Sequence, residues 1–139
     1  MYDLEKFLIA QERDYKTALS EIRSGRKRSH WIWYIFPQLK SLGYSPVAKK
    51  YGISDLGEAR AYLENAILRA RLTEISGALL ELDSSDPGEV MGYPDDLKLR
   101  SSMTLFREAD PSIEVFQKVL DKYYKGEGDP MTMAEVGRS

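Results

Sequence analysis

Two short stretches of the sequence carry side chains that could bind or transform a ligand. The first is "SGRKRSHWIWYIFPQ", residues 24–38, in which basic side chains lead directly into aromatic ones. The second is "YPDDLKLRSSMTLF", residues 93–106, in which two acids, a lysine and three hydroxyl groups lie close together. Basic and aromatic groups suit the binding of a flat anion, and an acid beside an amine suits proton transfer.

The basic part of the first stretch has the composition of an anion site. Five ionisable side chains surround Gly25 where one expected helix ends and the next begins: Arg23, Arg26, Lys27, Arg28 and His30. Guanidinium groups and the free N–H groups of a helix N-terminus both bind phosphate or carboxylate. The alternative is a solvated basic run that the dipole of the preceding helix stabilises. The site hypothesis makes Arg26, Lys27, Arg28 and His30 ligand-binding residues.

The aromatic part of the same stretch has two interpretations. Trp31 and Trp33 could fill a core, as large aromatics at helical spacing usually do, or could stack on a ligand. The indole N–H groups, His30 and Gln38 all need hydrogen-bond partners if they are buried. Because pocket walls combine apolar faces with a few polar groups, Trp31, Trp33 and Gln38 are also candidate ligand-binding residues.

Hydroxyl groups are concentrated in the second stretch. On a helix, Ser101 and Thr104 lie beside Lys98, and serine and threonine are indifferent helix formers. Each hydroxyl could donate to a carbonyl of the preceding turn, which is a purely structural role. The other interpretation is that Ser101 and Thr104 bind phosphate or ribose oxygens. The sequence leaves both open.

Three residues of the second stretch are candidate catalytic groups. Asp96 and Lys98 could transfer protons, and Ser102 stands one helical turn after Lys98. A serine–lysine nucleophile pair requires that the lysine be desolvated so that its pKa falls.

Composition excludes several classes of site. The 139 residues carry 20 Lys and Arg against 22 Asp and Glu, which argues against a general nucleic-acid binder. The chain has no cysteine and one histidine, so we expect no thiol chemistry, no metal site and no cofactor. The N-terminal segment has charges every few residues, unlike a signal peptide or membrane span. We expect a cytoplasmic monomer.

Helical periodicity and helix-terminating residues recur along the chain. The stretch "HWIWYIFPQ" fits both strand alternation and a helical stripe, and we favour a short buried helix that ends at Pro37. The other expected helices cover about residues 3–24, 46–51, 55–65, 67–82, 94–107 and 110–125, with a last turn in "DPMTMAEVG". No strand pair with a hairpin turn occurs. The prediction is an all-α fold, one compact domain over residues 1–139 in an orthogonal array of about six to eight helices.

The two stretches resemble a known family. The run His30-Trp31-x-Trp33-Tyr34-x-Phe36-Pro37-Gln38 is similar to the most recognisable pattern of the family catalogued as domain of unknown function eighteen-ten. The run from Asp95 to Phe106 is similar to its second pattern, and the resemblance extends over about residues 4–125. It implies a compact, mainly helical domain and supplies no reaction.

Two functional hypotheses follow. The first is a pocket for an anionic, nucleotide-like or phosphosugar ligand where the two stretches meet, including a hydrolase acting on such a ligand. The second is a non-enzymatic interaction module whose basic run docks an acidic partner peptide. The first requires that both stretches line one hollow, with the cationic groups facing into it.

Overall fold

The fold of the computed structural model is all-α, as the sequence predicts. The structure describes residues 2–137. Over these residues it holds nine α-helices and one 3₁₀ helix, somewhat more than expected: α1 Glu5–Arg23, α2 Ile32–Ile35, η1 Lys40–Leu42, α3 Pro46–Tyr51, α4 Leu56–Glu64, α5 Ala66–Leu80, α6 Pro87–Met91, α7 Asp95–Ala109, α8 Val115–Tyr124 and α9 Pro130–Val136. The only strand-like pairing in this part of the chain is an isolated bridge between Leu39 and Ile53.

Polar caps start the helices where the sequence placed them. The Ser45 hydroxyl accepts a hydrogen bond from the Ala48 N–H at 3.2 Å, with Pro46 in the first helical position of α3. The Asp55 carboxylate accepts from the Glu58 N–H at 2.8 Å and so begins α4. These contacts confirm the expected starts of both helices.

The two pairs Asp86-Pro87 and Asp110-Pro111 differ in whether they start a helix. Asp86 caps α6, a five-residue helix that lies outside the expected helical ranges. The pair at Asp110 was expected to start a helix, but the Asp110 carboxylate accepts from the Ser112 N–H and hydroxyl, and α8 begins only at Val115. The local turn satisfies the carboxylate that would otherwise cap the helix, so the expected start was wrong.

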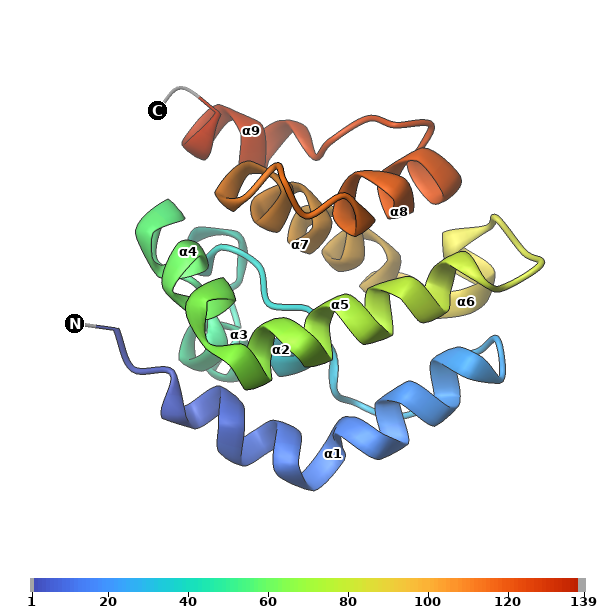
Figure 1. Ribbon diagram of the computed structural model, residues 1–139, viewed down its shortest axis with the longest axis horizontal. Coiled ribbons are helices and arrows are strands. Elements are labelled where there is room, and N and C mark those ends of the chain that lie inside the picture. Colours follow the sequence, from blue (N-terminus) through green and yellow to red (C-terminus); the bar gives the residue numbers. More distant parts are fainter. Residues whose placement is uncertain (1, 138–139) are drawn as a thin grey trace.

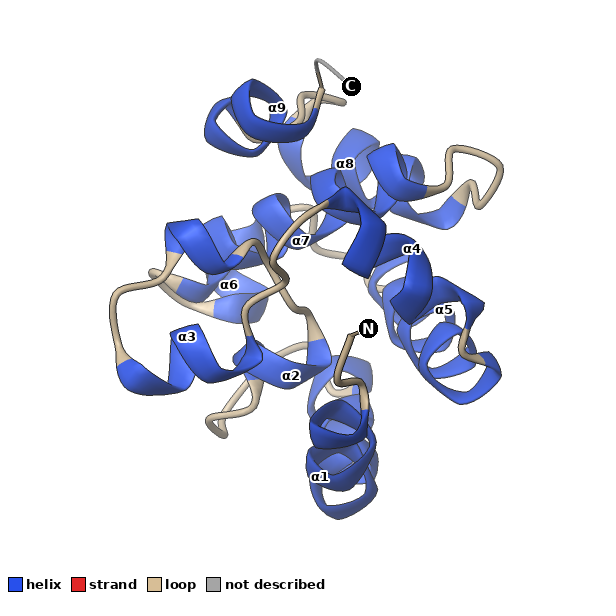
Figure 2. Ribbon diagram, turned by 90° about the vertical axis from the view of Figure 1, so that its left-hand side faces the viewer, coloured by secondary structure: helices blue, strands red, loops and turns tan. Residues whose placement is uncertain are grey.

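Helix α7 occupies the centre of the molecule, and Figures 1 and 2 show it surrounded by other helices. It packs against α2, α4, α6, α8 and α9. Rings of four elements form a continuous chain through the core. Tyr62 of α4 lies between Phe7 and Phe106, with ring centroids 5.2 and 5.0 Å away, and Phe106 contacts Phe116 at 6.0 Å.

Helix α2 connects the first functional stretch to the second. It packs between α1, α3 and α7, with Ile32 and Ile35 buried. The helix ends at Ile35, two residues before Pro37, close to the expected end. The aromatic segment and the helix of the second stretch are therefore neighbours in the fold.

A close backbone approach holds the segment after α2 in place. The Ile53 N–H donates to the Gln38 carbonyl at 2.9 Å, and the Lys40 N–H donates to the Ile53 carbonyl at 2.8 Å. Gly52 permits this contact, because a Cβ atom there would lie 2.4 Å from the Lys40 Cα.

Substitution of Gly52 by alanine tests this approach. We expect Gly52→Ala to lower the free energy of unfolding by about 2 kcal/mol, since backbone must shift to admit the methyl group. Gly77→Ala is the control, because a Cβ at Gly77 in α5 meets nothing within 4 Å. That change should raise stability by about 0.5–1 kcal/mol. Urea denaturation measures both, and equal effects would contradict the interpretation.

Candidate functional site

The buried carboxylate of Glu21, in the last turn of α1, organises the basic segment of residues 24–30, here called the basic loop. It accepts from the N–H groups of Arg28 and Ser29 at 2.7 and 2.9 Å, and from the Ser29 hydroxyl. It also accepts from the Trp31 indole N–H at 2.9 Å. The sequence predicted an anion at the guanidinium groups and the N–H groups of the following helix, whereas these loop donors bind a carboxylate of the chain itself.

The pKa of Glu21 reflects this arrangement. Burial of the carboxylate raises its pKa, but the hydrogen bonds from the Ser29 hydroxyl, the two backbone N–H groups and the Trp31 indole outweigh burial. Together they lower the pKa of Glu21 to about 2. The group therefore stays ionised at neutral pH and holds the loop by charge-assisted hydrogen bonds.

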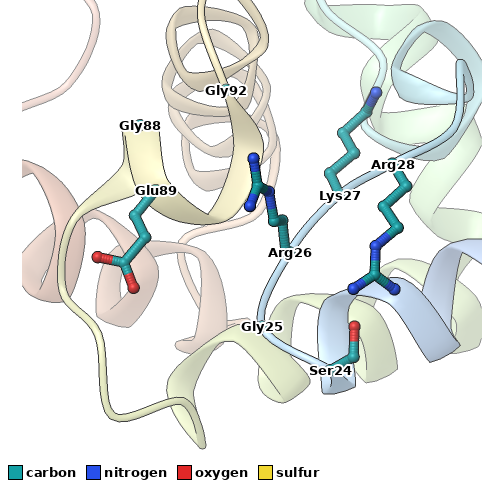
Figure 3. Close-up of a pocket in the computed structure, with 8 residues that line it drawn as sticks. All are labelled: Ser24, Gly25, Arg26, Lys27, Arg28, Gly88, Glu89 and Gly92. Carbon is teal, nitrogen blue, oxygen red and sulfur yellow. The ribbon is translucent and has the colours of Figure 1, made fainter.

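The three consecutive cations of the basic loop have different environments. Arg26 and Arg28 are exposed, whereas the Lys27 side chain is only 7% exposed and pairs with Asp95 at 2.8 Å. Figure 3 shows the Lys27 side chain extending away from Arg26 and Arg28. A hollow of about 550 Å³, here called the basic hollow, is lined by Ser24, Gly25, Arg26, Lys27, Arg28, Gly88, Glu89 and Gly92.

Ion pairs join the two functional stretches. The Asp95 carboxylate lies 2.8 Å from the Lys27 ammonium and 3.6 Å from the Lys98 ammonium. The Lys98 ammonium also lies over the Trp33 ring, 5.3 Å from its centroid. Segments far apart in the sequence are thus in contact, although the first hypothesis requires more, namely one hollow that both stretches line with the cationic groups facing into it.

A second hollow of about 400 Å³ lies along α7, here called the α7 groove. It is lined by Gln38, Leu42, Tyr44, Pro94, Leu97, Lys98, Ser101, Asp129 and Met131. Gln38 comes from the first stretch, and Lys98 and Ser101 come from the second. Of the predicted site residues, these three share one hollow, while Arg26, Lys27 and Arg28 line the other.

The remaining predicted site residues of the first stretch, Trp31, Trp33 and His30, line neither hollow. Trp31 is 1% exposed and belongs to the core, where its ring packs against Phe36. Trp33 is half-buried beneath Lys98. His30 is exposed, and its backbone carbonyl accepts from the Tyr34 hydroxyl. The core interpretation holds for Trp31.

Hydroxyl groups of α7 have mainly structural partners. Ser101 donates to the Leu97 carbonyl at 3.1 Å, and Thr104 donates to the Arg100 carbonyl at 2.7 Å. The Thr104 hydroxyl also accepts from the Asp129 N–H at 2.8 Å. The structural interpretation is confirmed for both of these hydroxyls.

The three candidate catalytic residues are not assembled in one hollow. Ser102 is fully buried, and its hydroxyl has no hydrogen-bond partner within residues 2–137. The Asp96 carboxylate accepts from the Leu97 N–H at 2.9 Å, and Asp96 lines neither hollow. Only Lys98 of this trio reaches the α7 groove.

Several groove or loop residues were absent from the sequence prediction of the site. Tyr44, Asp129 and Met131 line the groove from segments outside both stretches, and Glu21 organises the loop. The sequence contained a partial indication of the role of Glu21, because the indole N–H of a buried Trp31 needs a hydrogen-bond acceptor. Leu97 was also not predicted as a site residue, but it is 50% exposed and lines the groove.

The family model described as Protein of unknown function (DUF1810) matches residues 1–136. The chain belongs to this family. Its fold is similar to the crystal structure, at 1.38 Å, of the conserved hypothetical protein Rv1873 from Mycobacterium tuberculosis. The two chains are 46% identical with a TM-score of 0.95, over 98% of this chain and 97% of the other.

A search of curated proteins gave no match. Family membership agrees with the resemblance of the two stretches and brings no activity with it. Among the described residues, no helix is long and apolar enough to cross a membrane.

Removal of the Glu21 carboxylate should destabilise the protein. Glu21→Ala leaves the Trp31 indole and two backbone N–H groups without their acceptor, and we expect a loss of about 3 kcal/mol. The exposed Glu64 has no such partners, so Glu64→Ala should change stability by less than about 0.5 kcal/mol. Urea denaturation compares the two variants. A loss at Glu21 as small as that at Glu64 would refute its organising role.

The stabilisation by Glu21 should also depend on pH. Its folded pKa of about 2 lies below the ordinary value of 4.5, so its contribution is complete above about pH 4.5 and is lost as the pH falls toward 2. The stability difference between wild type and Glu21→Gln should be about 2 kcal/mol smaller at about pH 3 than at about pH 7. Urea unfolding at both pH values measures it, and a constant difference would contradict the lowered pKa.

Proposed function

We propose that the protein binds a small organic ligand in the α7 groove, one that joins a flat apolar part to an anionic group. Nucleotide-like molecules belong to this class through their base, whereas phosphosugars share only the anionic group. The observation that supports the proposal is that Gln38, Lys98 and Ser101 share one hollow with apolar side chains from three other segments. Pockets for small molecules typically have this mixture and are about 300–1,000 Å³ in volume.

The apolar part of the ligand would contact the walls of the groove. Tyr44, Leu97 and Met131 are 86, 50 and 64% exposed, which is a concentration of large apolar groups at one place on the surface. A tyrosine ring and a methionine thioether both make favourable contacts with flat rings. Covering these side chains would remove apolar surface from water.

The polar groups of the groove would orient the ligand. Asp95 lies between two ammonium groups and is closer to Lys27, so the charge of Lys98 is only partly compensated. The side-chain amide of Gln38 has no hydrogen-bond partner in the described chain and can donate or accept. Only one carboxylate oxygen of Asp129 is used to cap α9, so the other can accept from a ligand hydroxyl or amine.

The proposal covers binding and does not include hydrolysis. A hydrolase would need a nucleophile or activated water beside the ligand. Ser102 is fully buried and Asp96 lies outside the groove lining, so the predicted catalytic trio does not supply that arrangement. Docking of an acidic peptide is the alternative, and it concerns the basic loop rather than the groove.

Ligand binding in the groove can be tested with paired variants. A thermal shift screen with adenosine monophosphate, ADP-ribose, ribose 5-phosphate and glucose 6-phosphate should reveal a stabilising ligand at millimolar concentration. Leu97→Ser and Lys98→Gln should each weaken its binding about tenfold, as measured by calorimetry.

The control for this test is Ile67→Ser. Ile67 has an exposed fraction of 52%, close to that of Leu97, and lies on α5 outside the groove. Its substitution should leave the affinity unchanged. No stabilising ligand in the panel, or equal losses in all three variants, would end the proposal.

A further inference from the structure

We propose that the basic hollow is a separate site for a small dianion, a phosphomonoester or pyrophosphate group, held by the Arg26 and Arg28 guanidinium groups. This inference does not depend on a ligand in the α7 groove. The basic loop has one conformation, the two arginines have no acidic partner among the described residues, and open space lies beside them.

The loop that carries the two arginines is held in one conformation. Besides the contacts with Glu21 described above, the Arg26 N–H donates to the Glu21 carbonyl at 3.1 Å and the Lys27 N–H donates to the Val90 carbonyl at 2.7 Å. The Lys27 ammonium also donates to the Ser29 carbonyl. Because these hydrogen bonds already hold the loop in one conformation, a ligand does not have to order it, and the entropy cost of binding is lower.

Arg26 and Arg28 have no acidic partner among the described residues. Lys27, which stands between them, has turned inward to Asp95, and Glu21 is occupied by the backbone, Ser29 and Trp31. Glu89 is the one acid in the lining of the hollow, and Figure 3 shows its carboxylate pointing away from both guanidinium groups. Two positive charges therefore remain uncompensated beside the hollow.

The opposite wall leaves room for a ligand. Gly88 and Gly92, both on the α6 side, present no side chain to the hollow, and a Cβ added at Gly92 would meet no atom within 4 Å. The volume of about 550 Å³ exceeds what a single phosphate group needs. In Figure 3, Arg26 extends toward α6 and Arg28 toward Ser24, so the two groups would contact different parts of one ligand.

The chemistry of the site favours a phosphate group over other anions. A guanidinium group donates two parallel hydrogen bonds to phosphate oxygens, and two such groups match two negative charges. A long polyanion such as nucleic acid would also meet the rest of the surface of a chain with net charge −2. A compact dianion avoids that repulsion.

Inorganic pyrophosphate is the probe for this site, titrated into the full chain and followed by calorimetry. Arg26→Ala combined with Arg28→Ala should weaken binding at least about tenfold. The control combines Lys16→Ala with Arg69→Ala, which removes the same charge from exposed positions outside the basic hollow. The control should bind pyrophosphate as wild type does.

Binding should weaken as the salt concentration rises from about 50 to about 500 mM, because the two arginines are exposed. Circular dichroism of the double variant should match wild type, since neither guanidinium group has a partner within residues 2–137. Absence of pyrophosphate binding to wild type, or an equal loss in the control, would overturn the inference. Tighter binding of a hexaglutamate peptide than of pyrophosphate would also overturn it in favour of an acidic partner protein.

Discussion

The conformation of the basic loop depends on one constraint: the buried carboxylate of Glu21 needs hydrogen-bond donors. Glu21 lies at the end of the first helix, and its charge would be costly to bury without hydrogen bonds. The chain turns back at Gly25 and brings the Arg28 and Ser29 N–H groups and the Trp31 indole to it. The same turn fixes Trp31 in the core, and Arg26 and Arg28 remain on the surface.

Helix α7 combines two roles that usually belong to different elements. Its inner face carries Phe106 in the aromatic chain of the core, while its first turns carry Asp95, Leu97 and Lys98 toward the first stretch and the groove. The two roles are compatible in part because the Ser101 and Thr104 hydroxyls donate to carbonyls of the helix itself. The buried Ser102 hydroxyl, which has no partner among the described residues, is the exception.

The anionic ligand site expected from the sequence divides into two hollows in the fold. The arginines line one and the Gln38–Lys98 pair lines the other, with Asp95 contacting a lysine from each. The two proposed binding sites therefore share no lining residue within residues 2–137 and can be tested independently. The family and the related crystal structure carry no assigned activity, so binding measurements on these two hollows are the direct route to function.

Local patterns in the sequence determined the helices, because caps, prolines and apolar spacing act within a few residues. Ser45 caps α3, Asp55 caps α4, and regularly spaced apolar side chains form the buried face of α1. The chemistry of their side chains also made Gln38, Lys98 and Ser101 candidate site residues. Only the tertiary structure decided that Trp31 is core, that Leu97 is exposed and that Tyr44 and Met131 complete a groove. Those outcomes depend on which distant segments fold against each other, and burial at a position is set by the neighbours that cover it rather than by the residue itself.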